Sequence, residues 1–224
     1  MRGGLELIEF KDVCYEVDEK VILKNLNLSV LQGEFLSVLG SSGGGKTTFI
    51  RLCANLISPT SGKIYFKGED VNKLEPILYR QQTGYCFQEP HLFGDTVKEN
   101  LCFPYDVRGE TFDINRVYEL FSLFEIEKGF LDRKVDNLSG GEKQRIALVR
   151  TMLFTPKLML LDEVTSALDI ENTLVVEKVM ERLNKEGMTI IWITHDKEQA
   201  SRISANKILI NNGSLKRGGD IYGK

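Results

Sequence analysis

The chain has 224 residues, of which 42% are hydrophobic and 27% are charged, and its formal net charge is −3. This length and composition suit one sizeable core with room for a small attached subdomain. The weak negative charge does not favour a nucleic-acid partner. No apolar run approaches the roughly 18 residues of a membrane-spanning helix, and the first ten residues lack the core of a signal peptide. We therefore expect a cytoplasmic protein that reaches a membrane only through a partner.

The cysteines and histidines argue against a metal or disulfide framework. Two histidines, His91 and His195, are too few for a His-rich metal site. The cysteines are widely spaced and form no CxxC pair. They are Cys14, Cys53, Cys86 and Cys102. We expect buried thiols in a reducing compartment.

The first third of the chain predicts strands around a single helix. Leu5–Phe10 and Val21–Val30 alternate between apolar and polar residues, which is typical of strands in an antiparallel sheet. Glu34–Leu39 then predicts a short apolar strand that leads directly into a glycine-rich loop. The helix predicted after this loop spans Lys46–Leu56, and a further strand spans Lys63–Phe66.

The remainder of the chain predicts helices first and then an alternation of strands and helices. From about residue 88 to residue 150 the sequence is rich in helix, with amphipathic patterns over Asp113–Phe124 and Ser139–Phe154. The predicted elements that follow are the strands Leu158–Leu161, Met188–Thr194 and Lys207–Ile210 and the helices Ile170–Asn184 and Lys197–Ile203. This alternation indicates an α/β fold with a mostly parallel sheet and helices on both faces.

The glycine-rich loop at residues 40–47 fits the pattern G-x4-G-K-[ST]. Glycines allow successive backbone N–H groups to turn onto phosphates, and the helix that follows adds its positive N-terminal end. In this pattern Lys46 reaches the outer phosphates and the Thr47 hydroxyl is a Mg²⁺ ligand. A plain flexible turn would not need the strand before it and the helix after it. The expected nucleotide contacts are Gly40, Ser41, Ser42, Gly43, Gly44, Gly45, Lys46, Thr47 and Thr48.

An acidic pair, Asp162 and Glu163, ends the apolar run at residues 158–161. A buried strand places its C-terminal residue at the edge of the sheet where ligands bind. Alone, such a pair is most often a solvated strand end. Beside a phosphate loop, we expect Asp162 to hold Mg²⁺ through water and Glu163 to orient or deprotonate the attacking water.

A second candidate anion site begins at Ser139. Ser139 is a helix N-cap candidate, and Glu142 follows in the first turn. The two glycines between them, Gly140 and Gly141, exceed what a cap needs and offer bare backbone N–H groups at a helix N-terminus. One ATP does not need two such sites from one chain. We therefore expect two copies to share each ATP, with the Ser139 helix of one copy closing on nucleotide held by the other.

These motifs together resemble the ATP-binding subunits of ABC transporters. Residues 138–145, Leu-Ser-Gly-Gly-Glu-Lys-Gln-Arg, are similar to the family signature. Residues 161–163 and 166–169 follow as in that family, and the resemblance places Asp169 in a loop that contacts the partner copy. By the same resemblance, Gln88 touches Mg²⁺ and faces the membrane subunit, and His195 contacts the γ-phosphate.

The resemblance implies a RecA-like phosphate-loop core with an N-terminal antiparallel β subdomain and an inserted helical subdomain. Residues 1–87 and 155–224 would form the core, and residues 88–154 the helical subdomain. It further implies an ATP-hydrolysing motor that dimerises head to tail around two ATP with Mg²⁺. This motor would drive an integral-membrane permease from the inner face of the cell membrane.

Some positions depart from the family pattern. Ser41 stands where the family usually has Pro, and Gly44 where it has Ser; a loop that binds through its backbone tolerates both. The adenine-stacking aromatic falls on Val17, while Tyr15 lies two residues earlier. Both would point to the same face of a strand, so either could contact the base.

A narrower resemblance is to the ATPases of Fet-type bacterial iron exporters. It rests on residues 79–82, 84–97, 100–101 and 103–104, with support at residues 56–62 and 194–197. It implies a separate membrane subunit and metal export.

Two rival readings remain open beside transport. The first is a soluble ABC ATPase of DNA repair or translation, although such proteins carry long coiled-coil insertions or two fused ATPase domains. The second is a phosphate-loop kinase, which would leave residues 139–141 unexplained.

Overall fold

The computed structural model describes residues 4–217, which divide into two compact units. Of the described residues, the first unit contains residues 4–85, Pro156–Glu163 and residues 183–217. The second unit is built from Cys86–Thr155 and Val164–Arg182. The segment after Glu163 therefore clusters with the helices of the second unit, whereas the division drawn from the sequence places it in the core.

A six-stranded sheet of order β10-β9-β3-β8-β7-β6 lies in the first unit. Its strands are β3 (Phe35–Leu39), β6 (Thr83–Cys86), β7 (Leu158–Asp162), β8 (Thr189–Ile193), β9 (Asn206–Asn211) and β10 (Ser214–Arg217). Strands β9, β3, β8 and β7 are parallel, and every residue of β3, β7 and β8 is buried. Burial on both faces explains why these strands are continuous apolar runs in the sequence.

The register of this sheet aligns the carboxyl ends of its central strands. Ile193 of β8 pairs with Val38 of β3 on one side and with Asp162 of β7 on the other. The loops that leave β3, β7 and β8 therefore begin at the same level of the sheet, which is where open α/β sheets bind ligands.

A four-stranded antiparallel sheet of order β2-β1-β4-β5 completes the strands of this unit. Its strands are β1 (Glu6–Val17), β2 (Lys20–Leu31), β4 (Ser61–Phe66) and β5 (Glu69–Asp70). Strand β1 continues well past Phe10, where the alternating sequence pattern predicts its end. The pairing of β1 with β2 shifts between Phe10 and Val13, and Asp12 has a left-handed φ of 52°. A bulge of this kind interrupts the alternation without ending the strand.

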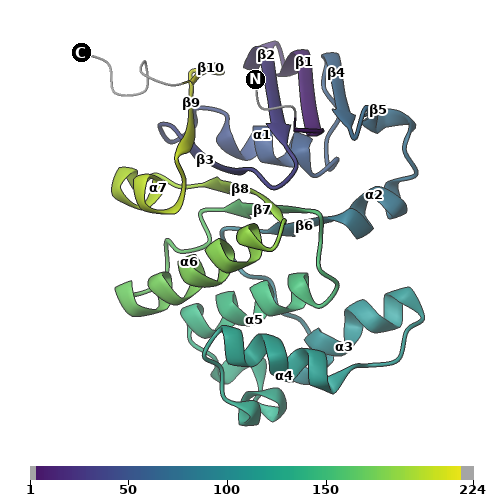
Figure 1. Cartoon of the computed structure of the whole chain (residues 1–224), viewed down its shortest axis with the longest axis vertical. Helices are drawn as coiled ribbons and strands as arrows, with labels where there is room; N and C mark the ends of the chain where they lie inside the picture. Colours follow the sequence, from purple (N-terminus) through teal and green to yellow (C-terminus); the bar gives the residue numbers. More distant parts are fainter. Residues whose placement is uncertain (1–3, 218–224) are drawn as a thin grey trace. The chain divides into compact units, whose positions relative to one another are not determined.

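One hydrophobic core joins the two sheets. Helix α1 (Lys46–Cys53) supplies Phe49, whose ring centroid lies 5.2 Å from that of Phe10 on β1. Side chains of β3, β7, β8 and β9 belong to the same cluster of buried residues. In the view of Figure 1, α1 lies above the strands β3 and β8, and α7 (Lys197–Ile203), which contacts β3, lies to the left of β8. The helices η1 (Val71–Lys73) and α2 (Pro76–Gln82) connect β5 to β6.

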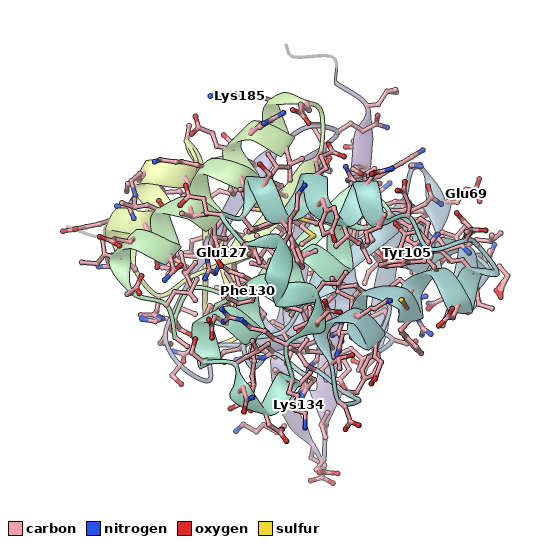
Figure 2. The ribbon with its side chains drawn as sticks, turned by 90° about the horizontal axis from the view of Figure 1, so that it is seen from below. Glu69, Tyr105, Glu127, Phe130, Lys134 and Lys185 are labelled. Atoms are coloured by element: carbon pink, nitrogen blue, oxygen red, sulfur yellow. The ribbon has the colours of Figure 1, made fainter. Side chains whose placement is uncertain are left out.

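The second unit is helical. Its elements are α3 (Val97–Arg108), α4 (Ile114–Leu123), η2 (Lys128–Asp132), η3 (Val135–Asn137), α5 (Gly140–Met152) and most of α6 (Ile170–Lys185). Both α3 and α4 contact α5. Tyr105, labelled in Figure 2, lies on α3, and its ring centroid is 4.8 Å from that of Phe154. The guanidinium of Arg133 lies 3.7 Å from the ring centroid of Phe130, which is also labelled.

The α/β class predicted from the sequence, with a largely parallel sheet and an antiparallel β subdomain, is confirmed. Among residues 4–217, no helix has both the length and the apolar character needed to cross a bilayer.

Candidate active site

The glycine-rich loop connects the end of β3 to the start of α1, as the sequence predicts. Lys46, the first residue of α1, is only 7% exposed. Its Nζ donates to the carbonyl oxygens of Gly40 at 3.1 Å and Ser41 at 3.0 Å. The ammonium group is thus folded back over the loop, inside the curve that the backbone makes.

Two glycines of this loop are required by close approach to other strands. A Cβ added at Gly40 would lie 2.0 Å from the carbonyl oxygen of Ile210 on β9. Gly45 has a φ of +105°, and a Cβ there would lie 2.7 Å from Cδ2 of Leu23 on β2. Both sheets therefore constrain the path of the loop, and only glycine fits at these two positions.

At the end of β7, Asp162 is 4% exposed and accepts a hydrogen bond from the Tyr85 hydroxyl at 3.2 Å. The Thr47 side chain also hydrogen-bonds to this carboxylate. Burial raises the pKa of Asp162 above its ordinary value, and the neighbouring Glu163 charge raises it further, while the bonds from Tyr85 and Thr47 oppose the rise. The site thus holds a buried carboxylate beside a hydroxyl at the start of α1.

Glu163 adopts a left-handed backbone conformation, with φ of 48°. This conformation is unfavourable for a residue with a Cβ and is concentrated at functional sites. It is held by a hydrogen bond from the Glu163 amide to the Ile193 carbonyl at 3.0 Å. The side chain then lies between two basic groups: Oε1 is 3.7 Å from Lys46 Nζ, and Oε2 is 3.4 Å from His195 Nδ1.

The first unit therefore brings together candidates from three strand ends: Lys46 and Thr47 after β3, Asp162 and Glu163 at β7, and His195 after β8. Asp196, next to His195, is the N-cap of α7 and accepts from the amides of Glu198 and Gln199. Ser42 lies exposed in the loop, and Thr48 lies in the first turn of α1.

The two adenine candidates differ in their surroundings. Tyr15 pairs with Leu23 across β1 and β2 and packs against the core of the first unit. Val17 pairs with Lys20 and is 44% exposed. Because Leu23 also limits the space at Gly45, the β1–β2 ribbon passes beside the glycine-rich loop.

Ser139 begins α5 with a capping box in the second unit. Its hydroxyl accepts from the Glu142 amide at 3.2 Å, and Glu142 Oε2 accepts from the Ser139 amide at 2.7 Å. Burial opposes ionisation of Glu142, but the bonds to Ser139 and the charge of Arg133 lower its pKa. A Cβ at Gly140 would meet no atom of the described residues within 4 Å, whereas one at Gly141 would lie 3.0 Å from Leu168. Packing within the described chain therefore does not require glycine at position 140.

Gln88 and Asp169 also belong to the second unit. Gln88 is exposed in the irregular segment between β6 and α3. Asp169 accepts from the backbone and side-chain nitrogens of Asn172 at 2.8 and 2.9 Å, and these bonds lower its pKa. Asp169 thus caps the first turn of α6.

Sequence reasoning missed Tyr85 and the supports of the loop. Tyr85 lies on β6, which is separated from β3 by two strands, and it belongs to none of the motifs assigned to phosphate, Mg²⁺ or catalysis. Asn211 accepts from the Ser41 hydroxyl at 2.8 Å, and the Gly213 amide donates to the Gly44 carbonyl at 3.1 Å. The sequence signals for Tyr85 are its place shortly before Gln88 and within residues 84–97 of the narrower resemblance.

Comparison with known proteins decides the family. A family model described as ABC transporter matches residues 23–166, which include the glycine-rich loop, the Ser139 segment and the acidic pair. The chain belongs to the ABC transporter family of ATPases. The family predicted from the motifs is confirmed, and the activity of the chain is ATP hydrolysis.

Relatives of this ABC ATPase are named for the transport of different substrates. It is 42% identical over 210 residues to the probable iron export ATP-binding protein FetA of Escherichia coli K12, across 93% of this chain and 92% of FetA. It is 37% identical over 223 residues to the spermidine/putrescine import ATP-binding protein PotA of Mesoplasma florum, of whose length it spans 63%.

Solved structures share the fold of this ABC ATPase. A dimeric post-hydrolysis structure of the ATP-binding cassette MJ0796, bound to ADP and Pi, matches with a TM-score of 0.84 and 29% identity, across 94% of this chain and 98% of that one. The cbiO1 protein of Clostridium perfringens, described as part of the transporter complex cbiONQ, matches with a TM-score of 0.82 and 25% identity, across 94% and 87% of the two chains.

Proposed function

We propose that this ATPase is a transport motor in which two copies close head to tail around two ATP molecules. The observation that carries the proposal is the start of α5, where exposed Gly140 has space for a side chain and yet lacks one. A glycine that its own chain does not need is explained by close approach of a group from outside. Bare N–H groups at a helix N-terminus suit the γ-phosphate of ATP held by the other copy, and dimeric relatives of the same fold support this arrangement.

In the proposed reaction the first unit holds and hydrolyses the nucleotide. The loop amides and Lys46 bind the phosphates. Glu163 orients the attacking water and accepts its proton, and the left-handed backbone at Glu163 aims the carboxylate toward Lys46 and His195. His195 holds the second oxygen of that carboxylate and contacts the γ-phosphate.

The residues at the end of β7 fit a Mg²⁺ ion. Asp162 and Thr47 supply adjacent oxygen ligands, which is the chemistry Mg²⁺ prefers, and this ion usually takes one or two protein ligands beside phosphate oxygens. A cation there would favour the ionised form of Asp162, whose pKa burial raises. By the family resemblance, Gln88 is a further proposed ligand of this ion. Bound Mg²⁺ would neutralise charge on the phosphates during transfer.

For the membrane partner and the cargo we propose a separate permease and iron export. The 42% identity to FetA over 93% of this chain supports iron, against 37% identity to a polyamine importer. The motor would then lie on the cytoplasmic face of the membrane, held there by the permease.

Light scattering of variants at Ser139 tests the shared site. In a Glu163→Gln background that traps ATP, we expect ATP-dependent dimers in the parent and none in Ser139→Arg, because a bulky cation would clash with the incoming copy. ATP binding by the Ser139→Arg monomer should be retained. Ser139→Ala loses the same helix cap, worth about 1 kcal/mol, without added bulk, so it measures how much of the effect is helix destabilisation. Normal dimers in Ser139→Arg would refute the shared site.

Metal content tests the cargo separately. Cells that lack this chain should accumulate iron under iron loading when the permease is present, measured by elemental analysis. Unchanged iron together with altered polyamine content would replace iron by a polyamine as cargo and leave the motor proposal intact.

A further inference from the structure

The segment that carries Gln88, residues 87–93, has neither helix nor strand, yet side chains of two helices hold it in the second unit. It runs from the end of β6 toward α3. Its backbone cannot satisfy itself through a regular ladder, so its carbonyl groups need partners from elsewhere. Three of these carbonyls are bound by side chains of α5 and α3.

Helix α5, which begins at the signature residue Ser139, contributes two of these side chains. Gln144 Nε2 donates to the Phe87 carbonyl at 3.3 Å. Arg150 Nη2 donates to the His91 carbonyl at 2.8 Å. The two residues are six positions apart, about 9 Å along a helix. Helix α5 therefore hydrogen-bonds to the Gln88 segment on both sides of Gln88.

Asn100 of α3 closes the far end of the segment. It is fully buried, and its Oδ1 accepts from the Phe93 amide at 3.0 Å and from Arg150 Nη1 at 2.9 Å. Its Nδ2 donates to the carbonyls of Phe93 at 2.6 Å and Thr96 at 3.0 Å. This uses both donors of the amide and two acceptor positions on its oxygen. Arg150 also lies 5.3 Å from the ring centroid of Phe93.

We call the side chains of Gln144, Arg150 and Asn100 that hold residues 87–93 the clamp. Burying its polar groups costs more free energy than a purely structural role would require. Burial lowers the pKa of Arg150, as expected for a cation withdrawn from water, and the two acceptors of its guanidinium are neutral amide oxygens. Gln144 is 1% exposed, and its Oε1 has no hydrogen-bond partner among the described residues. Buried polar atoms without partners are rare in native proteins. An apolar side chain would fill the Gln144 position without that penalty, but it could not hold the Phe87 carbonyl.

Other arginines of the second unit bind helix ends instead. Arg116 donates to the carbonyls of Met152 and Leu153 at the end of α5, and Arg145 donates to the Phe124 carbonyl at the end of α4. Those bonds satisfy carbonyls that any helix leaves unpaired. The bond from Arg150 differs, because the His91 carbonyl belongs to the irregular segment that presents Gln88.

We propose that Arg150 and Gln144 are positioning residues for Gln88, so that the helix beginning at Ser139 fixes the path of the Gln88 segment. This inference rests on the proposed function for the role of Gln88 in turnover. Contact of the partner's nucleotide with the start of α5 would then act on the same helix that sets the place of Gln88.

Hydrogen exchange of the Phe93 amide tests the clamp itself. Arg150→Met should speed this exchange about tenfold, the effect of losing one hydrogen bond, because Asn100 loses the guanidinium that orients its oxygen. Arg116→Met is the matched control: it removes a guanidinium from the same unit and should leave the Phe93 amide protected. Equal exchange in Arg150→Met and the parent would overturn the clamp.

Gln144→Met separates positioning from stability. It removes the unpaired Oε1, so the unfolding midpoint should be unchanged or higher, while kcat falls about tenfold and the KM for ATP stays within twofold. A kcat equal to that of the parent would overturn the positioning role of Gln144. This variant also keeps the inference testable if Arg150→Met does not fold.

A double-mutant cycle connects the clamp to Gln88. If Arg150 acts through Gln88, the double variant Arg150→Met/Gln88→Ala should have the same kcat as Gln88→Ala alone. If the two residues act independently, the fold-losses in kcat of the two single variants should multiply in the double variant. Multiplied effects would overturn the positioning role. Full turnover in Gln88→Ala would instead refute the part that the proposed function gives to Gln88, and the Phe93 exchange would still decide the clamp.

Discussion

Substitution of Gly45 by alanine should destabilise the first unit far more than the same change at Gly43, three positions after Gly40 in the same loop. Both glycines have left-handed backbones, with φ of +105° at Gly45 and +71° at Gly43. A Cβ at Gly43 would meet no described atom within 4 Å. A Cβ at Gly45 would lie 2.7 Å from Leu23 Cδ2 and 3.1 Å from the Ile22 carbonyl oxygen.

The two variants share one penalty and differ in the other. The left-handed conformation costs about 1 to 2 kcal/mol for alanine at either position. Leu23 is fully buried and cannot swing away, so Gly45→Ala adds an overpacking penalty of about 1 to 3 kcal/mol. For a chain of this size that difference corresponds to a thermal midpoint lower by roughly 2 to 12 °C than in Gly43→Ala.

Trp192 provides the assay. It is the single tryptophan of the chain, it lies fully buried in β8, and it therefore reports unfolding of the first unit. Tryptophan fluorescence during thermal and urea unfolding, without nucleotide, should show the larger loss for Gly45→Ala. Equal losses in the two variants would mean that the contact with β2 does not restrict the loop, and the steric argument would fail.

Three further predictions concern the chemistry. Lys46→Ala removes the buried cation of the loop, so calorimetry should show strongly weakened MgATP binding, and wild-type affinity would contradict the assignment. Glu163→Gln keeps the shape of the side chain but loses the base, and turnover should fall by about 10² or more while ATP still binds; normal turnover would transfer the role to another group. Tyr85→Phe removes a hydrogen bond that favours ionised Asp162. Because the pKa of Asp162 then rises further, the acidic limb of the pH–rate profile should move to higher pH, and an unmoved limb would show that Asp162 does not control it.

The secondary structure illustrates what local patterns can and cannot specify. The buried strands β3, β7 and β8 are uniform apolar runs, and α7 matches its predicted bounds, Lys197–Ile203. The alternating pattern predicts too short a β1, because the bulge at Asp12 breaks the alternation. Four elements, β5, α2, β6 and β10, are not predicted by the sequence pattern. These elements are short, and their pairing with distant strands stabilises them more than their own pattern does.

The site shows the same division between local motif and distant contact. The glycine-rich loop, the acidic pair and the capped helix at Ser139 are local motifs, and the structure places each on the element that its sequence indicates. Other contacts join residues that are 32 to 77 positions apart in the sequence. They are Tyr85 with Asp162, Glu163 with His195, and Arg150 with the His91 carbonyl. No local pattern marks such pairs, because they exist only once the strands and helices have packed.

The sequence by itself determined the family, the ATPase activity, the strand–loop–helix that receives phosphate and the acidic strand end, because each depends on residue type and short spacing along the chain. Only the tertiary structure decided which glycines of the loop are obligatory, that Glu163 has a left-handed backbone between two basic groups, and that α5 holds the Gln88 segment. These features arise where residues distant in sequence exclude one another's atoms or share hydrogen bonds inside a packed interior. Such constraints come from the three-dimensional arrangement of the neighbours and leave no regular trace in the order of the amino acids.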